Sequence, residues 1–150
     1  QALMEAAGDD GDFDALCQQL HRYQATLRTC FTLENFDNLI KNGRMRPIVG
    51  TLLRSLGIHI IADATAEGTI HVADKARGVG KTYRAITALM KASKDCTDAE
   101  VVISHCENLE GAMALKRQIL ADLPVKQVDL LSCRGLTSFY AMEKGLIVGY

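Results

Sequence analysis

Short apolar segments typical of buried strands alternate along this chain with amphipathic segments of helical period. Apolar residues at helical spacing predict helices over residues 12–28, 34–42, 47–56, 79–93, 109–123 and 136–142. Short apolar runs predict strands over residues 30–33, 58–66, 69–75, 100–104, 125–132 and 145–150. Because helices and strands that alternate in this way pack as layers, the pattern predicts a layered α/β (mixed α+β) domain, with helices packed on a mixed sheet.

Residues that favour turns and helix ends separate these segments. Glu67-Gly68 lies between two predicted strands, and the positive φ that Gly tolerates favours a β-hairpin at that point. Gly43 provides the left-handed conformation in which helices commonly end. Asn108 is a good N-cap for the helix over 109–123. We therefore expect the sheet to contain at least one antiparallel pair.

The composition excludes several classes of function. With 150 residues, 48% of them apolar, the chain is long enough for one globular domain with its own core. Its 17 Lys and Arg balance 18 Asp and Glu, whereas domains that bind nucleic acid usually carry a basic surplus. No apolar stretch approaches the roughly 20 residues of a membrane span, and the N-terminus does not resemble a signal peptide. We therefore expect a soluble, cytoplasmic protein without nucleic-acid partners.

The cysteines and histidines indicate neither a disulfide framework nor a metal site. The five cysteines form no Cys-x-x-Cys pair, which favours free thiols in a reducing compartment. The four histidines stand singly, so no zinc-binding spacing is present. His105 and Cys106 are neighbours in a strand and point to opposite faces, which separates a nucleophile from its base. Cys133 is expected to be an inert thiol, although a cation such as Arg134 lowers a thiol pKa. We expect no catalytic residue and no metal.

The loop Lys75–Thr82 indicates an alternative function. Gly78–Thr82 matches the second half of a phosphate-binding P-loop, and a predicted helix follows it. Lys75 stands where the motif requires Gly, and the preceding strand belongs to a hairpin rather than to a βαβ unit. Backbone N–H groups at this helix N-terminus, with Arg77 adjacent, still favour an anion site. An anion- or nucleotide-binding domain therefore stays open.

Several segments have a distinctive order and spacing when they are taken together. They are Phe31–Arg44 with its glycine-arginine motif, Gly50–Leu53, Leu56–Ile58, Lys75–Gly78 and Val101–Ala112. In this order they resemble the C-terminal domain of the DegV family, the bacterial fatty-acid-binding proteins. The resemblance extends over residues 12–150.

The resemblance implies half of a two-domain protein that holds one long-chain fatty acid and needs no cofactor. The N-terminal domain would bind the carboxylate, and the C-terminal domain would enclose the tail. Some members present the acid to a separate fatty acid kinase, so the binding protein is not itself an enzyme. Residues 1–33 are expected to be a lead-in helix and crossing strand from a missing N-terminal domain, and residues 34–150 the lipid-binding domain. The start at Gln1 without Met favours an excised domain.

The family's motifs transfer to individual residues of this chain. Arg44 corresponds to the arginine of the glycine-arginine motif, and Arg77 to that of the lysine-x-arginine motif; both would lie near the headgroup or on the kinase-facing surface. The family has a His in the loop before the last strand, whereas residues 132–140 here contain none. Arg134, Thr137 or Ser138 is expected to substitute as a donor, and the missing His puts the handling of an acyl phosphate in doubt.

The tail itself needs a dry, aliphatic lining. On the resemblance, the residues expected to line it are Ile48, Leu52, Leu53, Leu56, Ile58 and Ile60. The same residues also fit an ordinary core, and only the family resemblance favours the lining. A further alternative is a non-catalytic assembly domain, since the helix over 12–28 has an apolar face that could dock on a neighbour.

Overall fold

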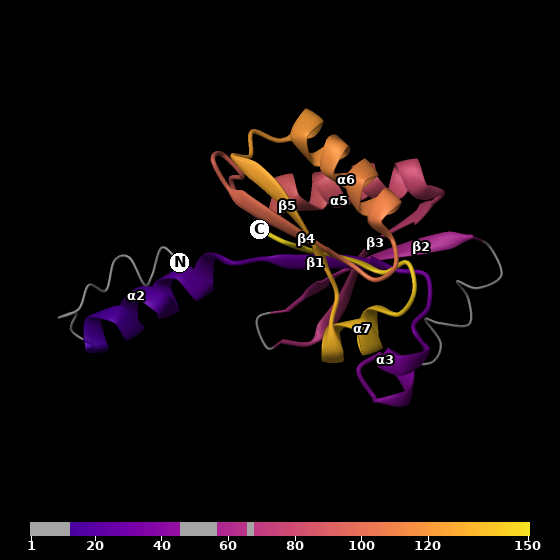
Figure 1. Ribbon diagram of the computed structural model, residues 1–150, viewed down its shortest axis with the longest axis horizontal. Helices are drawn as coiled ribbons and strands as arrows, with labels where there is room; N and C mark the ends of the chain where they lie inside the picture. The colour runs from indigo at the N-terminus through magenta and orange to yellow at the C-terminus, as the bar shows by residue number, and fades with distance from the viewer. Residues whose placement is uncertain (1–12, 46–56, 66–67) are drawn as a thin grey trace.

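The computed structural model describes residues 13–45, 57–65 and 68–150 (Figure 1). Its strands form a six-stranded sheet in the order β3-β2-β1-β6-β4-β5. They are β1 (Thr29–Leu33), β2 (Ile58–Ala64), β3 (Ile70–Arg77), β4 (Glu100–His105), β5 (Gln127–Ser132) and β6 (Leu146–Gly149). β4 and β5 are parallel, and the other neighbouring pairs are antiparallel. The predicted class, a mixed sheet that contains a β-hairpin, is confirmed.

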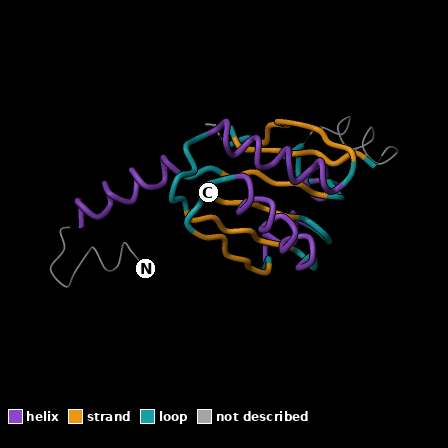
Figure 2. Tube along the Cα trace, turned by 90° about the horizontal axis from the view of Figure 1, so that it is seen from above, coloured by secondary structure: helices purple, strands orange, loops and turns teal. Residues whose placement is uncertain are grey.

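Helices cover the two faces of the sheet unequally (Figure 1). The long helices α5 (Val79–Ser93) and α6 (Leu109–Asp122) cover one face, and the short helices α3 (Asp37–Lys41) and α7 (Gly135–Ala141) lie against the other. We call these the α5/α6 face and the α3/α7 face. α2 (Phe13–Thr26) extends away from the sheet and has no buried residue (Figure 2). Among the described helices, none is both long and apolar enough to cross a membrane.

Strand alternation divides the core between these two faces. Cys30 and Val148 are fully buried on the α5/α6 face, where they belong to the larger core cluster. Ile60 is fully buried in the smaller cluster on the α3/α7 face, and Phe31 and Ile147 pack against it half-buried. Because successive side chains of a strand point to opposite sides, the central strands supply both clusters.

The pairing of β1 with β6 joins segments that are far apart in the sequence. Thr29 pairs with Gly149 and Thr32 with Leu146 in this antiparallel ladder. One step beyond it, the backbones of Arg28 and Tyr150 exchange hydrogen bonds of 2.8 and 3.0 Å. β1 pairs with β2 on its other side, and β6 pairs with β4. The ladder therefore connects the two three-stranded halves of the sheet.

The residues predicted to end helices and turns do so. Gly43 has φ +66° after α3, and Gly68 has φ +76° at the end of the hairpin turn. The Asn108 side chain accepts a hydrogen bond of 3.1 Å from the N–H of Gly111 and caps α6. It also donates a hydrogen bond of 2.8 Å to the carbonyl of Lys144, which ties α6 to the loop before β6. The sequence therefore predicted this hairpin turn and these helix ends correctly.

The largest differences lie between β1 and β2. The helix predicted over 34–42 begins only at Asp37, because the Asn35 side chain accepts the N–H of Asp37 at 2.8 Å and forms a turn ahead of it. The helix predicted over 47–56 lies outside the described residues. The other elements agree with their predictions to within about two or three residues at each end, which is the usual uncertainty of such boundaries.

Burial perturbs two ionisable groups near the central ladder. Burial, with a smaller contribution from the Asp63 carboxylate, raises the pKa of the Cys30 thiol from 9.0 to about 12. Burial also raises the pKa of Tyr150 from 10.0 to about 12, and the hydrogen bond with Ser93 opposes this shift. The two hydroxyl oxygens of that bond are 2.8 Å apart. Both groups are therefore held in their neutral form.

These shifts predict a loss of stability at alkaline pH. The unfolded chain releases the Cys30 proton near pH 9 while the folded chain keeps it to about pH 12. Stability from this group is thus complete below pH 9 and falls above it by at most about 1.4 kcal/mol per pH unit. Urea unfolding at pH 7 to 11 measures the effect. Cys30→Ala lowers stability at pH 7 but should flatten the decline; an unchanged slope would contradict the assignment.

Candidate functional site

An apolar cavity of about 310 Å³ lies on the α3/α7 face of the sheet. This volume is at the small end of the range for ligand pockets, which is about 300–1,000 Å³. Residues from the central strands, the two short helices and the loops beside them line it: Phe31, Leu33, Leu39, Arg44, Gly68, Ile70, Leu136, Tyr140, Ala141 and Ile147. The cavity is therefore built mainly of aliphatic and aromatic side chains.

Local geometry explains why these residues meet. Phe31 and Leu33 are two residues apart in β1, so both point to the α3/α7 face, and Ile147 of the paired strand β6 lies opposite Phe31. Leu136 and Tyr140 are four residues apart in α7 and therefore lie on one side of the helix. The sheet thus forms one wall of the cavity and α7 forms another.

Arg44 is the only charged residue among the described lining residues. It follows Gly43, whose φ of +66° turns the chain back after α3. The Arg44 N–H donates a hydrogen bond of 2.8 Å to the carbonyl of Leu39, which fixes the backbone at the cavity. Arg44 is exposed although it lines the cavity, so an anion from solution can approach it. A planar guanidinium is suited to bind a carboxylate or phosphate with two hydrogen bonds.

The opening of the cavity is apolar as well. Leu136 is 71% exposed and the neighbouring Phe139 is 46% exposed. Phe139 packs edge-to-face against Tyr140, with ring centroids 5.1 Å apart. Side chains of this kind at the mouth of an apolar pocket indicate a ligand or another protein surface that covers them. An amphipathic anion fits the arrangement, with its apolar part inside and its charge beside Arg44.

The other predicted headgroup residues are not part of the cavity lining. Arg77 is exposed at the end of β3, where it pairs with Ile58. Arg134 is exposed immediately before α7. Thr137 is exposed and Ser138 half-buried on α7. Among the described residues that line the cavity, Arg44 alone comes from this predicted set.

The predicted tail lining lies largely outside the described residues. Ile48, Leu52, Leu53 and Leu56 fall in the range 46–56, of which nothing is described. Ile60 is fully buried in the core cluster of the α3/α7 face, and Ile58 packs against that cluster half-buried. Both residues therefore lie on the α3/α7 face, which also carries the cavity.

Sequence reasoning missed most of the cavity. The lining from β1, β6 and α7 was not singled out, because an alternating strand does not reveal which strand will pair with it. The usable signal was the spacing of Phe31 and Leu33 in one strand and of Leu136 and Tyr140 in one helix. Either pair indicates a common face, but only the fold shows that the two faces meet.

The loop Gly78–Thr82 does not have the setting of a phosphate-binding P-loop. The strand before it, β3, pairs with β2 in an antiparallel hairpin at the edge of the sheet, whereas a P-loop follows a strand of a parallel βαβ unit. The hydroxyl of Thr82 donates a hydrogen bond of 3.1 Å to the carbonyl of Gly78. This bond is made within the first turn of α5 and satisfies the carbonyl of Gly78.

The cysteines do not form a catalytic site in the described part of the chain. His105 is buried toward the larger cluster, and its Nδ1 accepts a hydrogen bond of 3.4 Å from the N–H of Asn108. Cys106 packs instead against the cluster of the α3/α7 face, so the pair is separated as predicted. Burial, and to a lesser extent Cys106, raises the pKa of Cys133. Arg134 thus does not activate this thiol, in line with the inert thiol expected.

Known proteins resemble this chain over almost its whole length. The sequence pattern of a family described as uncharacterised proteins of the DegV family matches residues 1–146. A DegV domain-containing protein of Streptococcus gordonii is 31% identical over 151 residues, which cover 100% of this chain and 53% of that protein.

Solved structures share the fold. A DegV family protein from Eubacterium eligens, loaded with heptadecanoic acid, matches with a TM-score of 0.89 at 26% identity, over 99% of this chain and 53% of that one. The Fatty Acid Kinase (Fak) B3 protein of Streptococcus pneumoniae, loaded with linoleic acid, matches with a TM-score of 0.84 at 31% identity, over 99% and 54%. The chain therefore spans about half the length of these proteins.

Cys133, which packs against the core cluster of the α3/α7 face, gives a test of the inert thiol that the sequence predicts. Because burial raises the pKa of Cys133, we expect iodoacetamide at pH 7.5 to modify it more slowly in the folded chain than in urea, since a raised pKa lowers the fraction of reactive thiolate. Peptide mass spectrometry over time measures both rates. Cys17 on α2 serves as the internal control because it has the same intermediate exposure as Cys133. Faster labelling of Cys133 than of Cys17 would contradict an inert thiol.

Proposed function

The chain belongs to the DegV family, and on that premise we propose that it forms the acyl-chain-binding part of a protein that carries one long-chain fatty acid. The apolar cavity with Arg44 at its opening carries this proposal. Two similar proteins of solved structure hold heptadecanoic acid and linoleic acid, which are ligands of the same chemistry. The proposal rests on this agreement between cavity and ligand.

Burial of the acyl chain supplies the affinity. Each methylene group that leaves water for an apolar cavity contributes about 0.8 kcal/mol, which is about fourfold in the dissociation constant. In this proposal the sheet residues Phe31, Ile70 and Ile147 contact one side of the acyl chain. Leu136 and Tyr140 of α7 contact its other side. Residues 48–56, the predicted helical lining, complete the enclosure in this proposal.

The carboxylate lies at the opening of the cavity, within reach of Arg44. Arg134, Thr137 and Ser138, in or just before α7, are proposed as further donors, and Arg77, at the end of β3, as part of the surface that meets a partner. In this proposal they act only at the head of the ligand, since they are not among the described residues that line the cavity. Arg44 therefore carries most of the electrostatic contribution of this chain.

α2 serves a different purpose in this proposal, namely contact with the other half of a longer protein. α2 has no buried residue, and Phe13 and Tyr23 on it are 74% and 55% exposed. Matched proteins are about twice as long as this chain. We propose that the apolar side of α2 packs on the domain that this chain does not span, and that this domain supplies further ligands to the carboxylate.

A fatty acid kinase is the proposed partner. The kinase would transfer the γ-phosphoryl group of ATP to the carboxylate oxygen of the bound acid, which gives an acyl phosphate and ADP. The chain itself contributes binding and presentation, with no catalytic residue of its own. A kinase that uses ATP is consistent with action in the cytoplasm.

Filling the cavity should weaken acyl binding. We expect Ile147→Trp to weaken the binding of palmitic acid at least about tenfold, because the larger side chain occupies the volume that the ligand needs. Isothermal titration calorimetry on the delipidated protein at its natural length measures the change. Leu131→Trp is the matched control: Leu131 lies on β5 and is 54% exposed, away from the described lining.

The control variant should bind within about twofold of the unmodified protein, since a substitution at an exposed strand position is usually mild. Equal affinity of Ile147→Trp and the unmodified protein would place the acyl chain elsewhere. Copurification of the unmodified protein with no fatty acid, together with no heat of binding on titration, would contradict the proposed function itself.

A further inference from the structure

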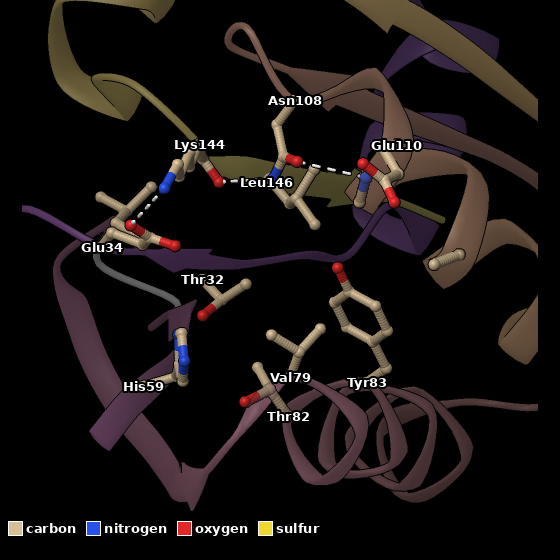
Figure 3. Close-up of a pocket in the computed structure, with 13 residues that line it drawn as sticks. Thr32, Glu34, His59, Val79, Thr82, Tyr83, Asn108, Glu110, Lys144 and Leu146 are labelled. Atoms are coloured by element: carbon tan, nitrogen blue, oxygen red, sulfur yellow. Dashed lines mark hydrogen bonds and ion pairs between the residues drawn. The ribbon is translucent and has the colours of Figure 1, made fainter. Parts of the chain in front are cut away.

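A second cavity of about 270 Å³ lies on the opposite face of the sheet, between the ends of the central strands and the first turns of α5 and α6 (Figure 3). Leu33, Val79 and Leu146 give it apolar walls. Polar side chains from five segments converge on it, which is the composition expected of a site for a small polar molecule. The proposed fatty-acid cavity and this second cavity share one lining residue, Leu33.

Thr32 is the least satisfied polar residue of this cavity. Its side chain points to the α5/α6 face of β1 and is only 6% exposed. Its Oγ1 is the one buried side-chain polar atom of the described residues without a hydrogen-bond partner. A buried hydroxyl without a partner is unfavourable, and a valine of the same shape would avoid the penalty. The position therefore indicates a ligand that hydrogen-bonds to Oγ1.

Glu110 provides an available charge on the same cavity. It lies in the first turn of α6, and no hydrogen bond or ion pair engages its carboxylate within the described chain. Figure 3 shows the Tyr83 ring across the cavity from Thr32, with its hydroxyl turned toward Glu110. Burial, and then Glu110 and Glu34, raise the pKa of Tyr83, so this hydroxyl stays protonated and can donate a hydrogen bond.

The other polar groups are partly occupied. Asn108 uses its amide to cap α6 and to bond the carbonyl of Lys144. The Lys144 ammonium lies 3.6 Å from the Glu34 carboxylate, so these two charges compensate each other. His59 also borders the cavity beside Thr32 (Figure 3). Among the described lining residues, Glu110 is thus a charge without an ion-pair partner and Thr32 carries a buried hydroxyl without a hydrogen bond; Glu110 is exposed and Thr32 buried.

We propose that this cavity binds a small amino alcohol, that is, an organic cation with an ammonium group at one end and a hydroxyl at the other. Glu110 pairs with the ammonium, and Thr32 Oγ1 hydrogen-bonds to the ligand hydroxyl. Val79 and Leu146 contact the short carbon chain between them, and the Tyr83 hydroxyl supplies a further polar contact. This site is independent of the fatty-acid site, because the sheet separates the two cavities.

Three probes of equal size separate the contributions to binding. 4-Amino-1-butanol carries both groups of the proposed ligand. Pentylamine lacks the hydroxyl, and 1-pentanol lacks the charge. Saturation-transfer NMR titrations on the 150-residue chain measure each affinity. We expect the amino alcohol to bind at least about tenfold more tightly than either comparator. Equal binding of pentylamine would contradict the role of Thr32, and equal binding of pentanol would contradict the role of Glu110. Failure of all three to bind would overturn the proposal.

Thr32→Val provides a signature that a purely structural residue would not show. We expect it to weaken binding of 4-amino-1-butanol about tenfold and to raise the Tm of the free chain, because an unsatisfied hydroxyl is removed. Thr87→Val is the matched control: the Thr87 hydroxyl is buried, donates to Asp122 at 2.7 Å and lies away from the cavity. It should lower the Tm and leave binding unchanged.

The charge is tested at an exposed position, where folding is not at risk. Glu110→Gln should weaken binding of the amino alcohol about tenfold and leave binding of 1-pentanol unchanged. Glu143→Gln, an exposed change outside the cavity lining, should change neither. Full affinity of Thr32→Val or of Glu110→Gln would overturn the proposal, whether or not the fatty-acid site proves correct.

Discussion

The antiparallel ladder between β1 and β6 is the interaction on which the rest of the structure depends. It joins the β3-β2-β1 half of the sheet to the β6-β4-β5 half, through the pairs from Thr29 with Gly149 to Thr32 with Leu146. These strands lie far apart in the sequence, so their pairing requires closure of most of the chain. Without this ladder neither face of the sheet would be continuous, and neither cavity would have a floor.

The same ladder gives the two faces different chemistry. On the α3/α7 face, Phe31 and Ile147 contribute apolar walls to a cavity whose one charged lining residue in the described chain is Arg44. On the α5/α6 face, Thr32 and Leu146 contribute to a smaller cavity with polar groups at its mouth. Alternation along β1 therefore assigns neighbouring residues to separate sites. One strand can serve a lipid on one side and a small polar ligand on the other, because the sheet keeps the two apart.

Sequence predicted what local chemistry determines. The hairpin at Gly68, the cap at Asn108 and the separation of His105 from Cys106 all follow from residues near one another, and the order of several modest motifs was sufficient for the family. The lining of the apolar cavity was not predictable in the same way, because it depends on β1 meeting β6 and on α7 folding back over both. Arg44 was found through its motif, whereas Phe31 and Ile147 carry no signal that distinguishes them from ordinary core residues.

The location of the acyl chain is the central claim, and intermolecular NOEs test it most directly. With methyl-labelled protein and ¹³C-labelled palmitic acid, the account predicts NOEs from the ligand methylenes to Ile70, Leu136 and Ile147 on the α3/α7 face, and none to Val101 or Leu115 in the core of the α5/α6 face. NOEs to Val101 and Leu115, with none to Leu136 and Ile147, would contradict it.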